Sequence, residues 1–408
     1  MAQYFTERLQ KVFHMIFKSY NQEMAQEGLR QLELIVNNQH TPEQPNHRAL
    51  RNDMTTSLEN EIDTKEDALK IANDPEAREI ADAYALLARI YAGPRFTWEE
   101  SNFPENNMRT YQCLHDSIRR CSPIGTLQAL RINGTITPTV EKDMLISFDD
   151  AFRIVYDYAE QGDAFCQYII GNVFFWRDDD RISLARDMIT PPRLSLAKRI
   201  QQSFQKGSIQ ERLIALQGTI SNETLQENAT KLAKEWFNRA LDNGLAMFQG
   251  NLRNIYIDEG DFNNARRVAL TAAELGNPTM MLYTGLDCHE HGKFENAFTW
   301  FTKGAALGQA ESTAELADYY YHFYDAKELR RVIPYDPVKA IGLYRRAATK
   351  YFSDAGYAAL QAAFGYIFHI GHLPLDWGLI ADLTHMAATK ERFMFSLPYI
   401  GYMRIHGF

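Results

Sequence analysis

The spacing of apolar residues predicts a chain built from helices. Within residues 4–20, apolar side chains recur three or four positions apart, as on one face of an amphipathic helix. They are Phe5, Leu9, Val12, Phe13, Ile16, Phe17 and Tyr20. A second helix is expected over about 22–36, with Leu29, Leu32 and Val36 facing inward.

A polar stretch follows these two helices. From Asn37 to about Lys65 the chain contains Pro42 and Pro45 among Asn, Gln and Thr, which is typical of a loop or linker. Order is expected to resume at Asp74-Pro75-Glu76, because these residues have the pattern of a helix N-terminus: a cap, a first-turn proline and an acidic side chain.

Four later helices share one pattern of apolar positions. Each opens on an alanine and carries an apolar seventh residue and an aromatic eleventh residue, which lie on the same helix face. The openings are Ala81, Ala164, Ala246 and Ala310; the seventh residues are Leu87, Ile170, Leu252 and Leu316; the eleventh are Tyr91, Phe174, Tyr256 and Tyr320. The eighth residue is small in three of the helices (Ala88, Gly171 and Ala317), which would let a partner helix approach closely, whereas the fourth has Arg253.

A repeat of 32 residues runs through the C-terminal half. Gly244, Gly276 and Gly308 close three similar phrases at this spacing, and the phrases that begin at Gly260 and Gly292 keep it too. A period of roughly 20–50 residues indicates a solenoid of repeated units. We therefore expect an all-α, right-handed solenoid of antiparallel helix pairs, capped by the N-terminal helices. Its expected parts are N-terminal helices and a polar linker (1–65), degenerate repeats with an insertion near 178–195 (66–230), and regular repeats with a C-terminal cap (231–408).

The stretch Ala159-Glu-Gln-Gly-Asp-Ala-Phe-Cys-Gln-Tyr-Ile-Ile-Gly171 resembles the Sel1-like repeat family, a branch of the tetratricopeptide-type helical repeats. The resemblance covers about 149–174 and 232–390, and 74–120 more weakly, although the 32-residue units look more tetratricopeptide-like. It implies a non-catalytic protein-binding scaffold, and a bacterial protein of a secretion, envelope or host-interaction assembly.

In tetratricopeptide-type folds, the first helix of each pair lines a concave groove. Matching positions here are Asn254, Asp258, Leu286, His289, Glu290, Asp318, Tyr321 and His322, with Tyr168 and Asn172 in an earlier unit. Aromatic side chains amid polar ones are typical of protein interfaces, and carboxylates favour a basic partner or a helix N-terminus. The expected partner is therefore a protein that presents a basic or helical segment. The alternative, that these are ordinary solvated polar positions, stays open.

Composition and motifs narrow the chemistry. The net charge of −9 argues against nucleic acid as a partner. No nucleotide-binding glycine motif or catalytic signature occurs, so neither enzymatic activity nor a cofactor is expected. The alternative is an enzyme or a membrane-associated regulator whose activity resides in the N-terminal segment.

Two clusters suggest metal ligands. Cys288-His289-Glu290-His291 has plausible zinc ligands, but no second Cys/His pair lies nearby, and Cys288 occupies the eleventh, inward position of its helix. Asp178-Asp179-Asp180 has the oxygen ligands that hard cations prefer, but it lacks the spacing of a calcium loop. We interpret the first cluster as packing and the second as a solvated insertion.

The sequence also bears on location. No run of about 18 apolar residues is present, and the N-terminus lacks the pattern of a signal peptide. Cytoplasmic residence is expected, with signal-less secretion left open. The only expected route to a membrane is the amphipathic helix within 4–20, for which a role as solenoid cap is favoured.

Overall fold

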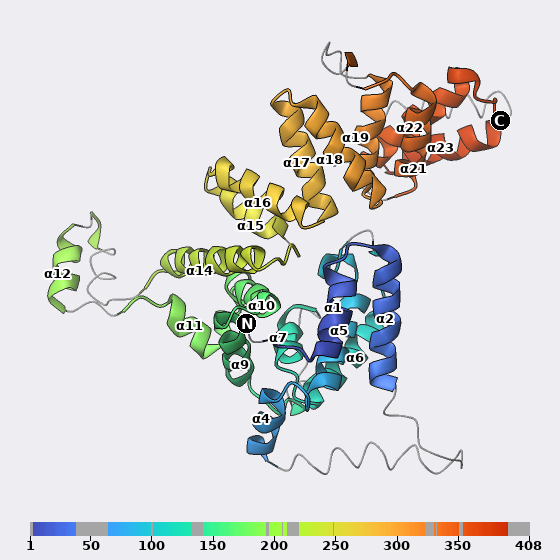
Figure 1. Ribbon diagram of the computed structural model, residues 1–408. Coiled ribbons are helices and arrows are strands. Elements are labelled where there is room, and N and C mark those ends of the chain that lie inside the picture. Colours follow the sequence, from blue (N-terminus) through green and yellow to red (C-terminus); the bar gives the residue numbers. More distant parts are fainter. Residues whose placement is uncertain are drawn as a thin grey trace, which may run out of the picture. The chain divides into compact units, whose positions relative to one another are not determined.

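The computed structural model is all-α, with helices packed as consecutive pairs, and confirms the predicted fold class (Figure 1). It describes residues 3–37, 64–98, 101–132, 142–192, 196–205, 207–209, 220–247, 249–322, 330–331, 333–350 and 354–390. Much of the predicted 37–65 linker therefore lies outside the described residues. The chain divides into two compact units, 1–247 and 248–408, which we describe separately as unit 1 and unit 2.

Unit 1 begins with a helical hairpin, α1 and α2, that packs on α5. Further pairs follow as α5 with α6, α7 with α9, and α10 with α14. The helices are α1 (Glu7–Phe17), α2 (Gln22–Asn37), α4 (Lys65–Asn73), α5 (Glu79–Tyr91), α6 (Asn107–Arg119), α7 (Pro123–Ile132), α9 (Phe148–Glu160), α10 (Ala164–Phe175), α11 (Ser183–Ile189), α12 (Leu196–Phe204) and α14 (Asn222–Asp242). Two 3-10 turns, η2 (Pro94–Phe96) and η4 (Asp178–Asp180), complete the described elements of this unit.

The apolar face of α1 lies inside unit 1. All seven apolar residues predicted for this face are buried. Phe5 and Phe13 contact Phe165 of α10, and the indole N–H of Trp98 donates to the Ile16 carbonyl oxygen at 2.8 Å. The surface that would have contacted a membrane is thus covered by protein in this structure.

The start of the next helix differs from the prediction. Helix α4, capped by Thr64, precedes Asp74, and α5 begins only at Glu79. Asp74 does accept a hydrogen bond from the backbone N–H of Glu76 at 3.0 Å, but this bond closes a turn between the two helices. Asp74 follows α4 as its C-cap residue, and Arg78 is the residue that precedes α5, so the prediction of a helix N-terminus at Asp74 was wrong.

In the residues of unit 2 that the structure describes, the helices form four pairs. They are α15 (Gln249–Asp258) with α16 (Phe262–Glu274), α17 (Pro278–Glu290) with α18 (Phe294–Ala306), α19 (Ala310–Tyr321) with α21 (Pro337–Ala348), and α22 (Ala355–Ile367) with α23 (Trp377–Lys390); the 3-10 turn η5 (Ile370–His372) lies before α23. Gly276, which follows α16, has a φ of +100°, and this left-handed conformation ends the helix as the repeat predicts.

The first helices of the four pairs lie side by side in unit 2. The Arg253 guanidinium carbon of α15 lies 4.0 Å from the ring centre of Tyr283 in α17. His289 of α17 contacts Tyr319 of α19, and Asp318 of α19 contacts Tyr357 of α22. We call α15, α17, α19 and α22 the first-helix layer, and α16, α18, α21 and α23 the second-helix layer.

The shared helix pattern is confirmed by burial. The seventh and eleventh residues of all four helices are buried. The small eighth residue accommodates an aromatic ring from a neighbouring helix: a Cβ added to Gly171 would lie 2.6 Å from the ring of Phe237. Gly285 of α17 has the same relation to Phe301, at 2.5 Å. The close helix approach inferred from the sequence is therefore present in both units.

Candidate protein-binding surfaces

The predicted groove residues of unit 2 differ in how far they reach solvent. Asn254 and Asp258 on α15 and Glu290 on α17 are exposed. Leu286, His289, Tyr321 and His322 are half-buried, and Asp318 is buried. The exposed residues of the predicted groove are therefore accessible to a partner, whereas the half-buried and buried ones contact neighbouring helices.

His289 has a joining role. Its Nδ1 lies 2.7 Å from the hydroxyl oxygen of Tyr319, and its ring packs edge-on against Phe294. Burial lowers the pKa of His289, although the nearby Glu290 acts in the opposite direction. The imidazole thus links α17 to α19 and favours its neutral form.

Asp318 holds three helices together. Its carboxylate accepts hydrogen bonds from the hydroxyls of Tyr344 in α21 and Tyr357 in α22, the latter at 3.2 Å. Burial raises the pKa of Asp318 to about 6, and the two tyrosine hydrogen bonds offset only part of this effect. With 7% of its surface exposed, Asp318 does not present its carboxylate to a partner as the tetratricopeptide alignment predicts.

Tyr321 and His322 end α19 and belong to an aromatic cluster. Both rings lie against Tyr335, and His322 Nε2 donates to the carbonyl oxygen of Ile333 at 2.8 Å. His322 has a φ of +53°, so the chain turns sharply at this residue. Tyr335 itself is 58% exposed, which gives this end of the first-helix layer an accessible aromatic side chain that the sequence alignment does not select.

The two candidates in unit 1 are less accessible. Tyr168 is buried, and its hydroxyl accepts a hydrogen bond from Arg89 at 3.3 Å. Asn172 is half-buried one turn further along α10. The tetratricopeptide pattern predicts that Tyr168 lines a groove. In the structure its ring lies in the interior, where Phe165, Phe237 and Arg89 surround it.

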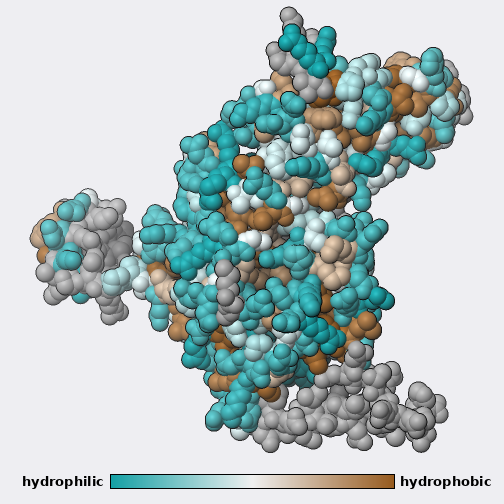
Figure 2. Space-filling model, viewed as in Figure 1, coloured by the Kyte–Doolittle hydropathy of each residue, from teal (hydrophilic) through white to brown (hydrophobic). Residues whose placement is uncertain are grey.

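Charge is divided between the two layers of unit 2. The first helices contain six Asp or Glu residues and one Arg, and α19 and α22 contain no Lys or Arg. The second helices contain seven Lys or Arg residues and three acidic ones. On the face drawn in Figure 2, apolar residues form scattered patches on a mostly hydrophilic surface. Charge, rather than one broad apolar patch, thus distinguishes the first-helix layer.

The two candidate metal clusters have other partners. Cys288 is half-buried and packs against the core of unit 2, and burial raises the pKa of its thiol. Asp178 and Asp179 are buried rather than solvated: Arg131 binds the first, and Arg177 and Arg186 bind the second. The solvated-insertion interpretation was wrong for Asp178 and Asp179, because Arg131, 47 positions away, and the nearby Arg177 and Arg186 pair with these carboxylates; Asp180 is exposed. Within the described part of the chain, no group of three or more His, Cys, Asp or Glu residues is placed to hold a metal ion.

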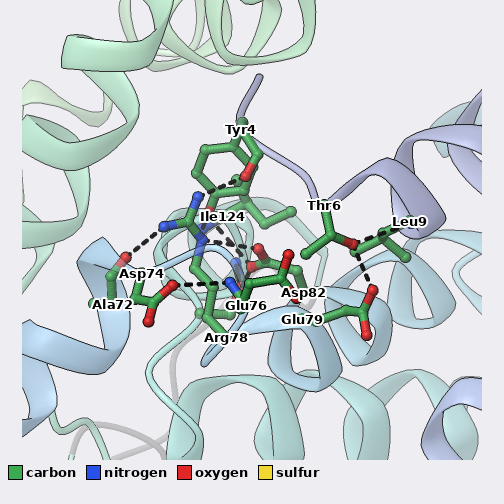
Figure 3. A network of polar contacts seen from close by, with 12 residues as sticks. Tyr4, Thr6, Leu9, Ala72, Asp74, Glu76, Arg78, Glu79, Asp82 and Ile124 are labelled. Atoms are coloured by element: carbon green, nitrogen blue, oxygen red, sulfur yellow. Dashed lines mark hydrogen bonds and ion pairs between the residues drawn. The ribbon is translucent and has the colours of Figure 1, made fainter. Parts of the chain in front are cut away.

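Sequence reasoning missed a buried polar network in unit 1 (Figure 3). Arg78 and Asp82 form an ion pair at 3.0 Å with almost no exposed surface, and both contact Tyr4. Burial raises the pKa of Asp82 to about 6, opposed by the charge of Arg78 and the hydroxyl of Ser122. In the sequence, the only sign of this network was a pair of opposite charges four positions apart, Arg78 and Asp82, at the start of α5. Tyr4, which both of them contact, lies 74 positions before Arg78, so no local pattern relates it to the pair.

No protein-family model matches the sequence, and no curated protein matches it. Among solved structures, the chain is similar to a Sel1 repeat protein from Oxalobacter formigenes, with 14% identity, a TM-score of 0.43, and coverage of 97% of this chain and 85% of the other. It is also similar to c5321, a protective antigen of uropathogenic Escherichia coli strains with an SLR fold, with 14% identity, a TM-score of 0.36, and coverage of 98% and 86%.

The structural similarity to Sel1 repeat proteins extends over nearly the whole chain, which is more than the residues 149–174 and 232–390 that carry the sequence resemblance. Among the helices that the structure describes, none is both long enough and apolar enough to cross a membrane.

Proposed function

We propose that this chain is a non-catalytic scaffold whose first-helix layer in unit 2 binds a basic segment of a partner protein. The observation that carries the proposal is the division of charge between the two layers. An acidic surface attracts a basic partner and rejects an acidic one, so it contributes to both the association rate and the specificity.

The accessible residues fit such a partner. Asp258 and Glu290 are exposed on neighbouring first helices, and Asn254 adds an exposed polar side chain one turn before Asp258 on α15. Tyr335 and the half-buried Tyr321 supply aromatic surface at the end of α19. Lysine and arginine stems pack against aromatic rings while their charged ends pair with carboxylates, and the layer offers both.

The setting that we propose is a bacterial assembly, at the envelope, in secretion or in contact with a host. The support for it is the resemblance of the sequence to Sel1-like repeats. We propose a cytoplasmic scaffold, with signal-less export as the second candidate.

The test is affinity capture from the native source with two matched variants. Asp258→Lys with Glu290→Lys reverses two exposed charges on the first-helix layer. Glu274→Lys with Glu295→Lys reverses two exposed charges on the second-helix layer and serves as the control. The first variant should weaken binding of the captured partner by about tenfold or more, and added salt should weaken wild-type binding, because both changes reduce charge attraction.

The control variant should bind as the wild type does. Capture of no stoichiometric protein, or equal binding by the wild type and the first-layer variant, would contradict the proposal. Circular dichroism of both variants verifies that the charge changes leave the helices intact.

A further inference from the structure

Residues 4–6 lie ahead of α1 in unit 1, and the main chain of Tyr4 is bound by side chains (Figure 3). The backbone N–H of Tyr4 donates to Asp163 Oδ2 at 3.0 Å. The Tyr4 carbonyl oxygen accepts from Arg78 Nη2 at 2.7 Å. Both main-chain groups of one residue are therefore fixed by charged side chains that lie 74 and 159 positions away.

The side chain of Tyr4 fills a closed pocket. It has no exposed surface, and its hydroxyl donates to Asp82 Oδ1 at 3.3 Å and accepts from the Ile124 backbone N–H at 3.4 Å. Its ring centre lies 4.0 Å from the Arg78 guanidinium carbon, and the ring of Tyr158 packs edge-on against it. Every polar atom of Tyr4 thus has a partner.

The pocket is itself held in place by other groups. Arg78 Nη1 donates to the Ala72 carbonyl oxygen at 2.8 Å, and the Ser122 hydroxyl donates to Asp82 at 2.6 Å. Asp163 also accepts from the Cys166 N–H at the start of α10. These bonds belong to unit 1 without Tyr4, so the pocket is organised by residues other than the one it encloses.

The two residues after Tyr4 are also matched by the surface. Phe5 stacks on Phe165, with ring centres 5.6 Å apart, and the Thr6 hydroxyl donates to Glu79. Three consecutive side chains and the main chain of Tyr4 are therefore contacted together by other parts of unit 1.

If stability alone mattered, apolar side chains could occupy this site at a lower desolvation cost than Arg78, Asp82 and Tyr4. Burying an arginine, a carboxylate and a phenol is unfavourable unless each is paired, and an apolar replacement of similar volume is often at least as stable. The polar pocket instead selects one residue type and one direction of the chain. Covalent connection between the α1–α2 hairpin and α4 runs only through residues 38–63, a stretch of 26 residues.

We propose that the pocket formed by Arg78, Asp82, Ile124, Tyr158 and Asp163 is a peptide-binding site. In this structure the chain's own Tyr4-Phe5-Thr6 segment occupies it in cis. The same site binds this segment when a second copy of the chain presents it in trans, and the ligand class is an extended Tyr-Phe-Thr peptide with a free main-chain N–H at the tyrosine.

The experiment uses the full chain with a protease recognition sequence inserted between residues 38 and 63. The protease cuts the purified chain at this sequence, and both fragments stay in the sample. A fluorescent peptide of residues 1–37 is then added, and its uptake is followed by anisotropy. The cut chain should bind the peptide saturably. The Tyr4→Phe peptide should bind about tenfold more weakly, because it lacks the hydroxyl that contacts Asp82 and Ile124.

A Met24→Ala peptide is the matched control, because Met24 is exposed on α2. It should bind as the unmodified peptide does. Failure of the cut chain to take up any peptide, or equal affinity of the Tyr4→Phe and unmodified peptides, would overturn the proposal.

Hydrogen exchange on the uncut chain covers the case in which cutting unfolds unit 1. Residues 4–37 should exchange faster than α5 and α10, and Tyr4→Phe should accelerate exchange in residues 4–37 alone. The proposal would be overturned if residues 4–37 exchanged at the same rate as α5 and α10 and Tyr4→Phe accelerated all three equally. That result would show that Tyr4 is an ordinary core residue.

Discussion

At the scale of single residues, buried carboxylates are a shared feature of the two units. Asp82 in unit 1 and Asp318 in unit 2 are both buried and both contact tyrosine hydroxyls. Only Asp82 has an arginine as an ion-pair partner. Asp318 is held by the hydroxyls of Tyr344 and Tyr357 in the presence of Asp354, so its charge is the less well compensated.

Asp318 should make stability depend on pH. Its pKa in the folded state is about 6, against an ordinary value of 3.8, so the folded protein binds the proton more tightly than the unfolded chain. This contribution to stability is fully present below pH 4 and is lost as the pH rises through 6. Asp318→Asn removes the titration, and the stability of the variant relative to wild type should rise between pH 4 and 7, by on the order of 2 to 3 kcal/mol.

Urea unfolding at the two pH values measures this change. Asp382→Asn, at an exposed position on α23, is the control and should show a constant difference from wild type. A constant difference for Asp318→Asn as well would mean that Asp318 does not take up its proton on folding.

At the scale of helices and helix pairs, the small eighth residue determines how closely two helices approach. Gly171 and Gly285 leave room for the rings of Phe237 and Phe301. The periodic pattern predicted this relation correctly, because it depends on residues close in sequence and on one repeated spacing.

Gly285→Ala should destabilise unit 2 by about 1–3 kcal/mol, because its Cβ would lie 2.5 Å from the Phe301 ring. Gly342→Ala is the matched control: this glycine lies within α21 with nothing within 4 Å of an added Cβ. It should be stabilising by about 0.5–1 kcal/mol, as alanine is preferred in helices. Thermal unfolding distinguishes the two, and destabilisation by both variants would rule out the Phe301 contact as the cause.

The features that the sequence did not predict depend on contacts between distant positions. The pairing of Tyr4 with Arg78 and Asp82, and of Asp178 with Arg131, joins helices that no local pattern relates. Helix α4 was missed because a polar, proline-containing stretch comes before it. Asp318 and Tyr168 were assigned to a groove because their positions along the helix match groove positions in tetratricopeptide-type repeats. Whether such a position is exposed depends on which neighbouring helix covers it, and both residues are buried.

At the scale of the whole molecule, two units of consecutive helix pairs have different polar features. Unit 1 encloses its own N-terminal segment in a buried polar pocket, and unit 2 separates acidic from basic residues between two helix layers. The proposed partner is assigned to the first-helix layer because its helices contain six acidic residues and one arginine, whereas the helices of the second layer contain seven basic residues and three acidic ones.

Site-specific photo-cross-linking in the native cell tests this assignment most directly. A photoreactive residue is placed at exposed Asn254 or Glu290 in the first-helix layer, and at exposed Asn263 or Thr302 in the second-helix layer. We expect the partner to be cross-linked from Asn254 and Glu290, through a segment rich in Lys and Arg, and not from Asn263 or Thr302. Adducts formed only from Asn263 and Thr302, or equally from all four positions, would contradict this assignment.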